Sequence, residues 1–145
     1  MPTVDAKSHA FMEAIKEMEL SRSVDQLLLL FTADATLDSI AYDEPRTGLA
    51  DIRTFWEEYL GAFKEVATKF TQVINVNDVA VLEWTSKGTL TNGLPVRYRG
   101  ATLLEFVDDR VKSFRAYYDS AAFIPEYEKH LKRTSRNPAH SFANP

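Results

Sequence analysis

The residues of this sequence best suited to chemistry are aromatic and hydroxyl-bearing. Tyr98 and Tyr118 each carry a phenol that can donate a hydrogen bond to a carbonyl or to a developing oxyanion. Trp84 offers an aromatic plane on which a flat ligand can stack. The same side chains also occur as ordinary core or wall residues whose polar tips bond to backbone or water. Their role therefore depends on whether the fold arranges them around a cavity.

Other kinds of chemistry find little support. The chain has no cysteine, which removes disulfides and thiolate nucleophiles. Its histidines, His9, His130 and His140, share no metal-ligand spacing with one another or with a carboxylate cluster, so no metal site is predicted. There is no glycine-rich phosphate loop and no nucleophile elbow, so we expect no cofactor.

Charge and hydropathy limit the classes of partner that we expect this protein to bind. A net charge of −4 provides no basic field for nucleic acid. The apolar run from Leu27 to Phe31 is far too short to cross a membrane, and the first residues contain no apolar signal core. We therefore expect a cytoplasmic protein that binds neither nucleic acid nor a membrane.

The length of 145 residues predicts one domain. We place it at residues 1–134 and expect residues 135–145 to form a loose tail, because they contain turn formers and few apolar side chains. Helical spacing of apolar residues and a capping box at Ser23 and Gln26 predict the helices. They are expected at Asp5–Leu20, Ser23–Phe31, Leu49–Phe63 and Pro125–Arg133.

Between and after these helices the apolar period changes to two, which indicates strands. Asn92-Gly93 is a strong hairpin signal. The strands are expected at Ala35–Ile40, Ala67–Val76, Val79–Thr91, Pro95–Val107 and Val111–Asp119. Helices segregated from an antiparallel sheet predict an α+β fold, in which a curved antiparallel sheet wraps around helices as a cone with a mouth.

Alternation along the strands separates two faces of the sheet. One face carries rings and hydroxyls, and the other carries Glu83, Arg97, Arg99, Glu105, Arg115 and Asp119. Because ionised groups resist burial, the charged face should look toward water or a partner subunit. We expect cross-strand ion pairs there, Glu83 with Arg99 or Arg115 and Asp119 with Arg115 or Arg99.

The aromatic face should then meet the aromatic side chains of the helix at 49–63, which include Phe55, Trp56 and Tyr59. Two arrangements remain open. The hydroxyls and rings line a cavity for an apolar molecule with a few oxygens, or they pack into a filled core with satisfied hydroxyls.

Two segments resemble a known superfamily. "LFTADATLDSIAYDEPRTGLADIRTFW" (Leu30–Trp56) is similar to the same region of bacterial ketosteroid isomerases, SnoaL-like polyketide cyclases and limonene epoxide hydrolases, which belong to the nuclear transport factor 2-like superfamily. "DDRVKSFRAYYDSAAF" (Asp108–Phe123) resembles the last strand of that superfamily. The resemblance, which spans about Phe11 to Phe123, implies an α+β cone with an apolar pocket, usually in a homodimer formed through the outer sheet face.

The catalytic residues of these relatives do not carry over. The resemblance places the isomerase base at Ser39, its oxyanion-hole tyrosine near Ile15 and its protonated aspartate near Thr102. The aspartate–arginine–aspartate relay of the epoxide hydrolases falls at about Ala116, Trp84 and Ser86. Neither steroid isomerisation nor limonene-type epoxide hydrolysis is therefore expected.

Asp38 is adjacent to the position of the isomerase base. A β-bulge would turn it inward as a general acid or base, and without one it is a solvent-facing strand residue. We predict Asp38 and Tyr118 as catalytic residues. The predicted substrate-binding residues are Ser39, Tyr42, Phe55, Trp56, Tyr59, Trp84, Ser86, Tyr98, Thr102, Phe114 and Ala116.

The prediction is a SnoaL-like small-molecule enzyme with an apolar pocket. It would act without a cofactor as an acid/base isomerase, cyclase or hydratase/dehydratase on a polyketide-, terpenoid- or steroid-like substrate. The alternative is a non-catalytic module of the same fold that binds a small apolar ligand or dimerises. The expected partners are that small molecule and a second copy of the chain, bound through the charged outer sheet face.

Overall fold

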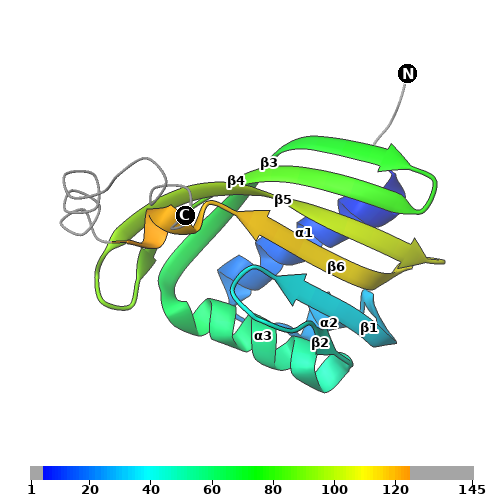
Figure 1. Ribbon diagram of the computed structural model, residues 1–145, viewed down its shortest axis with the longest axis horizontal. Coiled ribbons are helices and arrows are strands. Elements are labelled where there is room, and N and C mark those ends of the chain that lie inside the picture. Colours follow the sequence, from blue (N-terminus) through cyan, green and yellow to red (C-terminus); the bar gives the residue numbers. More distant parts are fainter. Residues whose placement is uncertain (1–4, 125–145) are drawn as a thin grey trace.

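The computed structural model describes residues 5–124 and shows an open, curved sheet with helices against its concave side (Figure 1). The helices are α1 (Ala6–Ser21), α2 (Asp25–Leu28), α3 (Leu49–Ala62) and the short 3-10 helix η1 (Ser120–Phe123). The strands are β1 (Phe31–Ser39), β2 (Arg46–Thr47), β3 (Phe63–Val76), β4 (Val79–Leu90), β5 (Pro95–Val107) and β6 (Arg110–Tyr118).

The six strands form one sheet in the order β2-β1-β6-β5-β4-β3. All neighbours pair antiparallel except β1 and β6, which are parallel, so the sheet is mixed rather than wholly antiparallel. It is also not closed, because β2 and β3 are its edges. With these two refinements, the predicted α+β cone is confirmed.

Helix α1 begins and ends close to its predicted bounds. The Asp5 carboxylate accepts a hydrogen bond of 2.8 Å from the backbone N–H of Lys7 and so caps the first turn. Phe11, Ile15 and Met18 are buried at helical spacing, which turns one face of α1 toward the core. The helix stops at Arg22, whose backbone is left-handed with φ of 65°.

The second helix is much shorter than predicted. It ends at Leu28, and β1 already begins at Phe31, whereas the sequence pattern placed the helix up to Phe31 and the strand from Ala35. Phe31 is the register partner of Val111 in β6, and the Val111 N–H donates to the carbonyl of Leu30 at 2.7 Å. Pairing with a strand far along the sequence thus outweighs the local helical preference.

Helix α3 passes directly into β3 without a loop, so the strand starts at Phe63 instead of the predicted Ala67. The Arg22 guanidinium fixes this junction because one nitrogen donates to the carbonyls of Leu60 at 2.8 Å and Phe63 at 2.9 Å. These bonds satisfy acceptors that the end of a helix leaves free. The two-residue strand β2, which pairs with β1, was not predicted.

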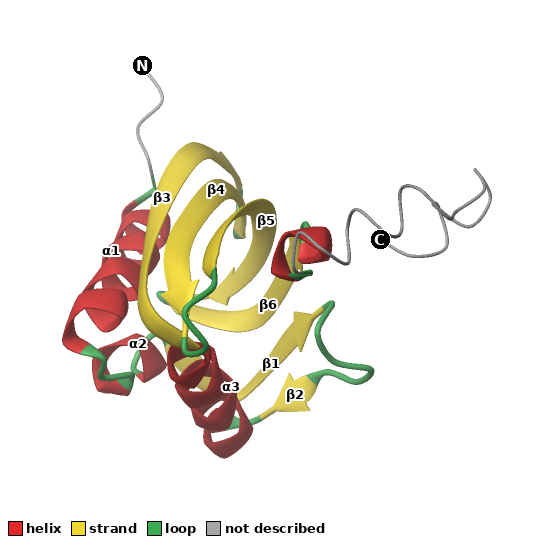
Figure 2. Cartoon of the chain, turned by 90° about the vertical axis from the view of Figure 1, so that its left-hand side faces the viewer, coloured by secondary structure: helices red, strands yellow, loops and turns green. Residues whose placement is uncertain are grey.

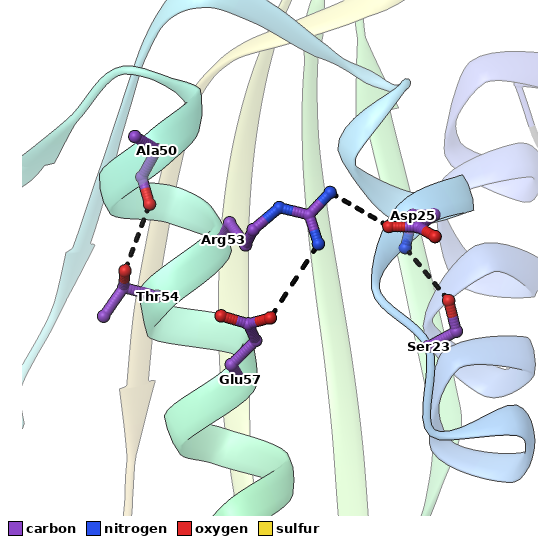
Figure 3. Close-up of polar contacts among 6 residues, drawn as sticks. All are labelled: Ser23, Asp25, Ala50, Arg53, Thr54 and Glu57. Carbon is purple, nitrogen blue, oxygen red and sulfur yellow. Dashed lines mark hydrogen bonds and ion pairs between the residues drawn. The ribbon is translucent and has the colours of Figure 1, made fainter.

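Helices α2 and α3 are joined at the surface by Arg53 (Figure 3). Its guanidinium lies 2.9 Å from the Asp25 carboxylate and 3.8 Å from that of Glu57. The Ser23 hydroxyl accepts from the N–H of Asp25 at 3.4 Å, rather than from the region of Gln26 that the capping box predicted. These groups are exposed, so the ion pairs contribute little stability, typically about 0.2–1 kcal/mol each.

The curvature of the sheet leaves an interior between β3–β6 and the helices (Figure 2). Helix α1 packs against β3, and α3 contacts β1, β2 and β3. Trp84, Ser86 and Tyr98 are buried on the concave side, while Glu83 and Arg99 are exposed on the convex side. The division into an aromatic inner face and a charged outer face therefore agrees with the observed burial.

The predicted ion pairs of the outer face are wrong. Arg115 pairs with Glu105 at 2.8 Å, because the β5–β6 register sets Leu103 opposite Arg115 and brings Glu105 alongside on the same face. Asp119 lies beyond the end of β6, where its carboxylate accepts from the N–H of Ala121 at 3.1 Å and caps η1.

The helix predicted at Pro125–Arg133, the domain boundary at residue 134 and the tail at 135–145 lie outside the described residues, as do His130 and His140. Within residues 5–124, no helix has both the length and the apolar character needed to cross a membrane. The same range contains no group of three or more His, Asp or Glu side chains placed to hold a metal ion.

Candidate functional site: an aromatic cavity with a hydroxyl wall

A cavity of about 250 Å³ lies inside the cone, between α1, α3 and the concave face of the sheet. Its walls are predominantly apolar. Every residue predicted to bind the substrate lines it, namely Ser39, Tyr42, Phe55, Trp56, Tyr59, Trp84, Ser86, Tyr98, Thr102, Phe114 and Ala116. Tyr118 also lines the cavity.

One wall is a rigid aromatic cluster centred on Trp56. The Trp56 ring meets Phe55, Tyr59 and Phe114 edge to face, with centroid separations of 4.9, 5.6 and 5.4 Å. Such T-shaped contacts add about 0.5–1.5 kcal/mol each to the burial of the rings. The Trp56 indole N–H is buried and has no hydrogen-bond partner within the described residues, so this otherwise apolar wall contains one unpaired donor.

A second aromatic group closes the other end. Tyr98 lies edge to face with Trp84 at 5.6 Å and with Tyr118 at 5.7 Å, and Phe123 of η1 packs over Tyr98 at 4.7 Å. Helix η1 thus covers the cavity at the end of β6. The side chains come from three strands and η1, and only the tertiary fold brings them together.

Glu19, for which the sequence predicted no role, is 6% exposed and lies behind the polar wall of the cavity. Its carboxylate accepts hydrogen bonds from the Tyr59 hydroxyl at 2.7 Å, the Thr68 hydroxyl at 2.6 Å and the Thr68 N–H at 2.8 Å. The Thr68 hydroxyl in turn lies 2.7 Å from that of Ser86. Tyr59, Thr68 and Ser86 all line the cavity, so the carboxylate is linked to it through hydroxyl groups.

A signal for Glu19 was present in the sequence. It follows Ile15 by four residues, which places it on the buried face of α1. A carboxylate at such a position requires hydrogen-bond donors in the interior. The pattern could therefore have flagged Glu19, but it could not have named Tyr59 and Thr68 as the donors.

The interior shifts two phenols toward their neutral forms. Burial raises the pKa of Tyr98 to about 12, although the Ser86 and Tyr59 hydroxyls act in the opposite direction. Burial also raises the pKa of Tyr59 well above its ordinary value, with the charges of Tyr98 and Glu19 adding to the effect. Both phenols are therefore neutral at physiological pH, and the Tyr59 hydroxyl donates its hydrogen bond to Glu19.

Asp38 does not line the cavity. A bulge does occur in β1, but it lies between Phe31 and Thr36. Because this is upstream of Asp38, it does not turn Asp38 inward. From Thr36 to Ser39 the register is continuous, so Ser39 faces the interior and Asp38, opposite Arg115, faces the outer side. A direct contact between Asp38 and a ligand in the cavity does not fit this placement.

The rim of the cavity holds a different carboxylate. The Tyr42 hydroxyl donates to Glu58 at 2.9 Å, and the Arg46 guanidinium lies over the Tyr42 ring at 4.2 Å. Burial and the bond to Glu58 raise the pKa of Tyr42. Glu58 borders the cavity but its side chain is 55% exposed, which marks this cluster as the mouth.

Known structures share this architecture. An NTF2-like protein from Anabaena variabilis ATCC 29413 superposes with a TM-score of 0.75 at 18% identity, over 84% of this chain and 97% of that chain. A proposed SnoaL-like polyketide cyclase from Jannaschia Sp. CCS1 gives 0.70 at 12% identity, over 95% and 98%. A ketosteroid isomerase-like protein from Catenulispora acidiphila DSM 44928, solved with trimethylamine, gives 0.70 at 21% identity, over 77% and 87%. At these identities the likeness establishes the fold alone.

A comparison with curated proteins gave no match. The family model described as "SnoaL-like domain", in contrast, matches residues 9–114, which include α1, α3 and all strands up to the middle of β6. The cone, its strand order and this match agree, and the chain therefore belongs to the SnoaL-like domain family and has the fold of NTF2-like proteins of known structure.

Proposed function

We propose that this protein binds a compact, apolar, oxygen-bearing molecule in its cavity and catalyses a proton transfer on it without a cofactor. The reaction class is isomerisation, cyclisation, hydration or dehydration, and the substrate is polyketide-, terpenoid- or steroid-like. The observation that carries this proposal is an aromatic cavity of about 250 Å³ whose hydroxyl groups gather on one wall in front of a buried carboxylate.

The cavity supports a small substrate. Ligand pockets commonly measure roughly 300–1,000 Å³, so within these three substrate classes this cavity suits a compound of one or two rings better than a complete four-ring steroid. Apolar walls exclude water and thereby strengthen each hydrogen bond made to a substrate oxygen. Tyr98 is suited to orient a carbonyl, since burial raises its pKa and keeps the phenol neutral as a donor at physiological pH. The Tyr118 side chain lines the same cavity and carries a second hydroxyl.

The second candidate is a non-catalytic binding module. One observation favours it: in residues 5–124, the carboxylate that borders the cavity directly is that of Glu58 at the exposed rim. If no group exchanges protons with the ligand, the same cavity serves only for binding.

Ligand binding is the first test. Purified protein would be screened by thermal shift against steroids, monoterpenoids and small aromatic polyketide analogues, and hits would be titrated by tryptophan fluorescence, because Trp56 and Trp84 both line the cavity. We expect at least one class to raise the melting temperature. If no class does, the interior behaves as a packed core and the proposal is wrong.

Proton transfer is the second test. Each bound ketone or enol would be incubated with the protein in D2O, and loss of its exchangeable C–H signals would be followed by NMR. Protein-dependent exchange supports the enzyme, whereas binding without exchange supports the non-catalytic module.

We also propose that the chain forms a homodimer through the outer face of the sheet. Register partners form a row across β3–β6 on that face: Ile74, Val81, Leu103 and Arg115. The first three side chains of the row are apolar and the last is charged. Leu103→Asp should convert the dimer to a monomer, which size-exclusion chromatography with light scattering would detect as a halved molar mass. A monomeric wild-type protein would contradict this part of the proposal.

A further inference from the structure

We propose that Glu19 is the proton acceptor of the cavity, reached from a bound phenol or enol through the hydroxyls of Ser86 and Thr68. This inference rests on the proposed function, since it requires a ligand with an acidic hydroxyl in the cavity. It adds the group that exchanges the proton, its route and the chemical class of ligand.

The hydrogen bonds give the route a direction. Three donors converge on the Glu19 carboxylate: the Tyr59 hydroxyl, the Thr68 hydroxyl and the Thr68 N–H. This set matches an ionised carboxylate, which only accepts. Because the Thr68 hydroxyl donates to Glu19 at 2.6 Å, its contact of 2.7 Å with Ser86 is satisfied when Ser86 donates to Thr68. Ser86 Oγ then presents only acceptor capacity to the cavity.

A ligand hydroxyl next to Ser86 therefore meets an acceptor at the end of a connected chain. The ligand O–H bond breaks and a bond forms to Ser86 Oγ; the Ser86 proton passes to Thr68 Oγ1, and the Thr68 proton passes to Glu19 Oε2. The ligand becomes an enolate or phenolate, Glu19 becomes neutral, and both hydroxyls are regenerated with their bonds reversed.

Glu19 also has a way to exchange that proton with solvent. Besides its link to the cavity, it borders a separate groove on the outside of the cone. The same groove is lined by Arg22, Lys64, Glu65, Lys87 and Arg97. On the cavity side the titratable groups near Glu19 are Tyr59 and Tyr98, whose raised pKa values keep them neutral at physiological pH. The carboxylate thus lies between the interior and the surface, with cations along the surface side.

Thr68 and Ser86 are placed by the sheet rather than by local sequence. They are register partners on β3 and β4, and both face the interior. Glu19 reaches them from α1, which packs on β3. Glu19 is 6% exposed and Ser86 is 2% exposed, so both ends of the hydroxyl chain lie within the buried wall.

The test uses 2-naphthol, a compact photoacid whose neutral and anionic forms fluoresce at different wavelengths. The full-length protein would be saturated with the probe and excited beyond the tryptophan absorption. We expect anionic emission from the probe bound to wild type, because its excited hydroxyl is strongly acidic and an acceptor chain is present. In Thr68→Val, which preserves the side-chain shape and leaves Glu19 in place, the ratio of anionic to neutral emission should fall about tenfold.

Thr71→Val is the matched control. It makes the same change on β3 at an exposed position outside the cavity, where the Thr71 hydroxyl donates to the carbonyl of Glu83 at 3.2 Å. The Ser86–Thr68–Glu19 chain stays intact in this variant, so anionic emission should persist. Ser86→Ala and Glu19→Gln should both behave like Thr68→Val. Circular dichroism and a binding titration would confirm that each variant folds and holds the probe; if Glu19→Gln does not fold, Thr68→Val and Ser86→Ala decide the question.

The outcomes separate this inference from the proposed function. Bound probe with unchanged anionic emission in Thr68→Val and Ser86→Ala overturns the route while leaving ligand binding intact. Loss of emission in Thr71→Val as severe as in Thr68→Val shows a general structural effect and also overturns it. If wild type binds neither 2-naphthol nor any ligand of the screen, both the route and the proposed function fall.

Discussion

The indole Nε1–H of Trp84 donates a hydrogen bond of 2.9 Å to the hydroxyl of Thr102 on the neighbouring strand, with both side chains buried in the cavity wall. The β4–β5 register makes this contact possible, because it sets Gly100 opposite Trp84 and Thr102 opposite Leu82. A large indole therefore lies over a glycine and reaches diagonally to the next inward-facing residue. The bond fixes the orientation of the ring against which a ligand would lie.

Thr102→Val should destabilise the protein by about 1–3 kcal/mol, because the buried indole N–H loses its acceptor while the shape of the wall is retained. Urea unfolding followed by circular dichroism would measure the change. In a Trp84→Phe background no indole donor remains, and the same substitution should cost much less. Equal costs in the two backgrounds would contradict a specific Trp84–Thr102 bond.

Gly100→Ala should destabilise by about 1–3 kcal/mol through overpacking. An added Cβ at this position would meet the backbone carbonyl oxygen of Tyr117 first, and would lie 2.8 Å from Trp84 Cζ2 and 2.8 Å from Tyr118 Cβ. Gly61→Ala in α3 is the matched control, since nothing lies within 4 Å of its added Cβ. There the gain in helix propensity should stabilise by about 0.5–1 kcal/mol. Thermal unfolding of the two variants should shift in opposite directions, and a stabilised Gly100→Ala would refute the close approach.

Tyr118→Phe should weaken ligand binding or turnover, whereas Tyr117→Phe should not. The two tyrosines are neighbours on β6, but Tyr118 lines the cavity and Tyr117 is 49% exposed on the outer face. Loss of one hydrogen bond to a ligand oxygen corresponds to about 0.5–1.5 kcal/mol, or roughly a threefold to tenfold change in Kd. Titration of both variants with a ligand found in the thermal-shift screen would measure it. Equal effects of the two substitutions would remove the Tyr118 hydroxyl from the site.

Stability should decrease between pH 10 and 12 in a manner that depends on Tyr98. Its pKa is raised from 10.0 to about 12 by burial, so in this range the unfolded chain releases a proton that the folded chain keeps. The contribution is complete below pH 10 and is lost as the pH rises toward 12, by on the order of 2 kcal/mol in total. Urea unfolding at both ends of this range would show a smaller loss for Tyr98→Phe. An identical loss in wild type and variant would mean that Tyr98 ionises normally in the folded protein.

Local patterns were sufficient for much of the fold. Period-two alternation and the Asn92-Gly93 turn define β4 and β5 to within a residue, and the apolar spacing of α1 and α3 defines those helices. The same parity placed Trp84, Tyr98 and Tyr118 inside and Glu83 and Arg99 outside. These features depend on neighbours along the chain, for which side-chain direction follows from backbone periodicity.

The remaining features of the site arise from contacts between segments that lie far apart in the sequence. The parallel pairing of β1 with β6 shortened α2 and set a continuous register at Ser39, which turned Asp38 away from the cavity. Packing of α1 on β3 brought Glu19 to Tyr59 and Thr68, residues 40 and 49 positions away in sequence. Local periodicity therefore specified the helices and strands and their inner and outer faces. The carboxylate that serves the cavity was decided by helix–sheet packing, since a hydrogen bond between segments has no periodic signature within either of them.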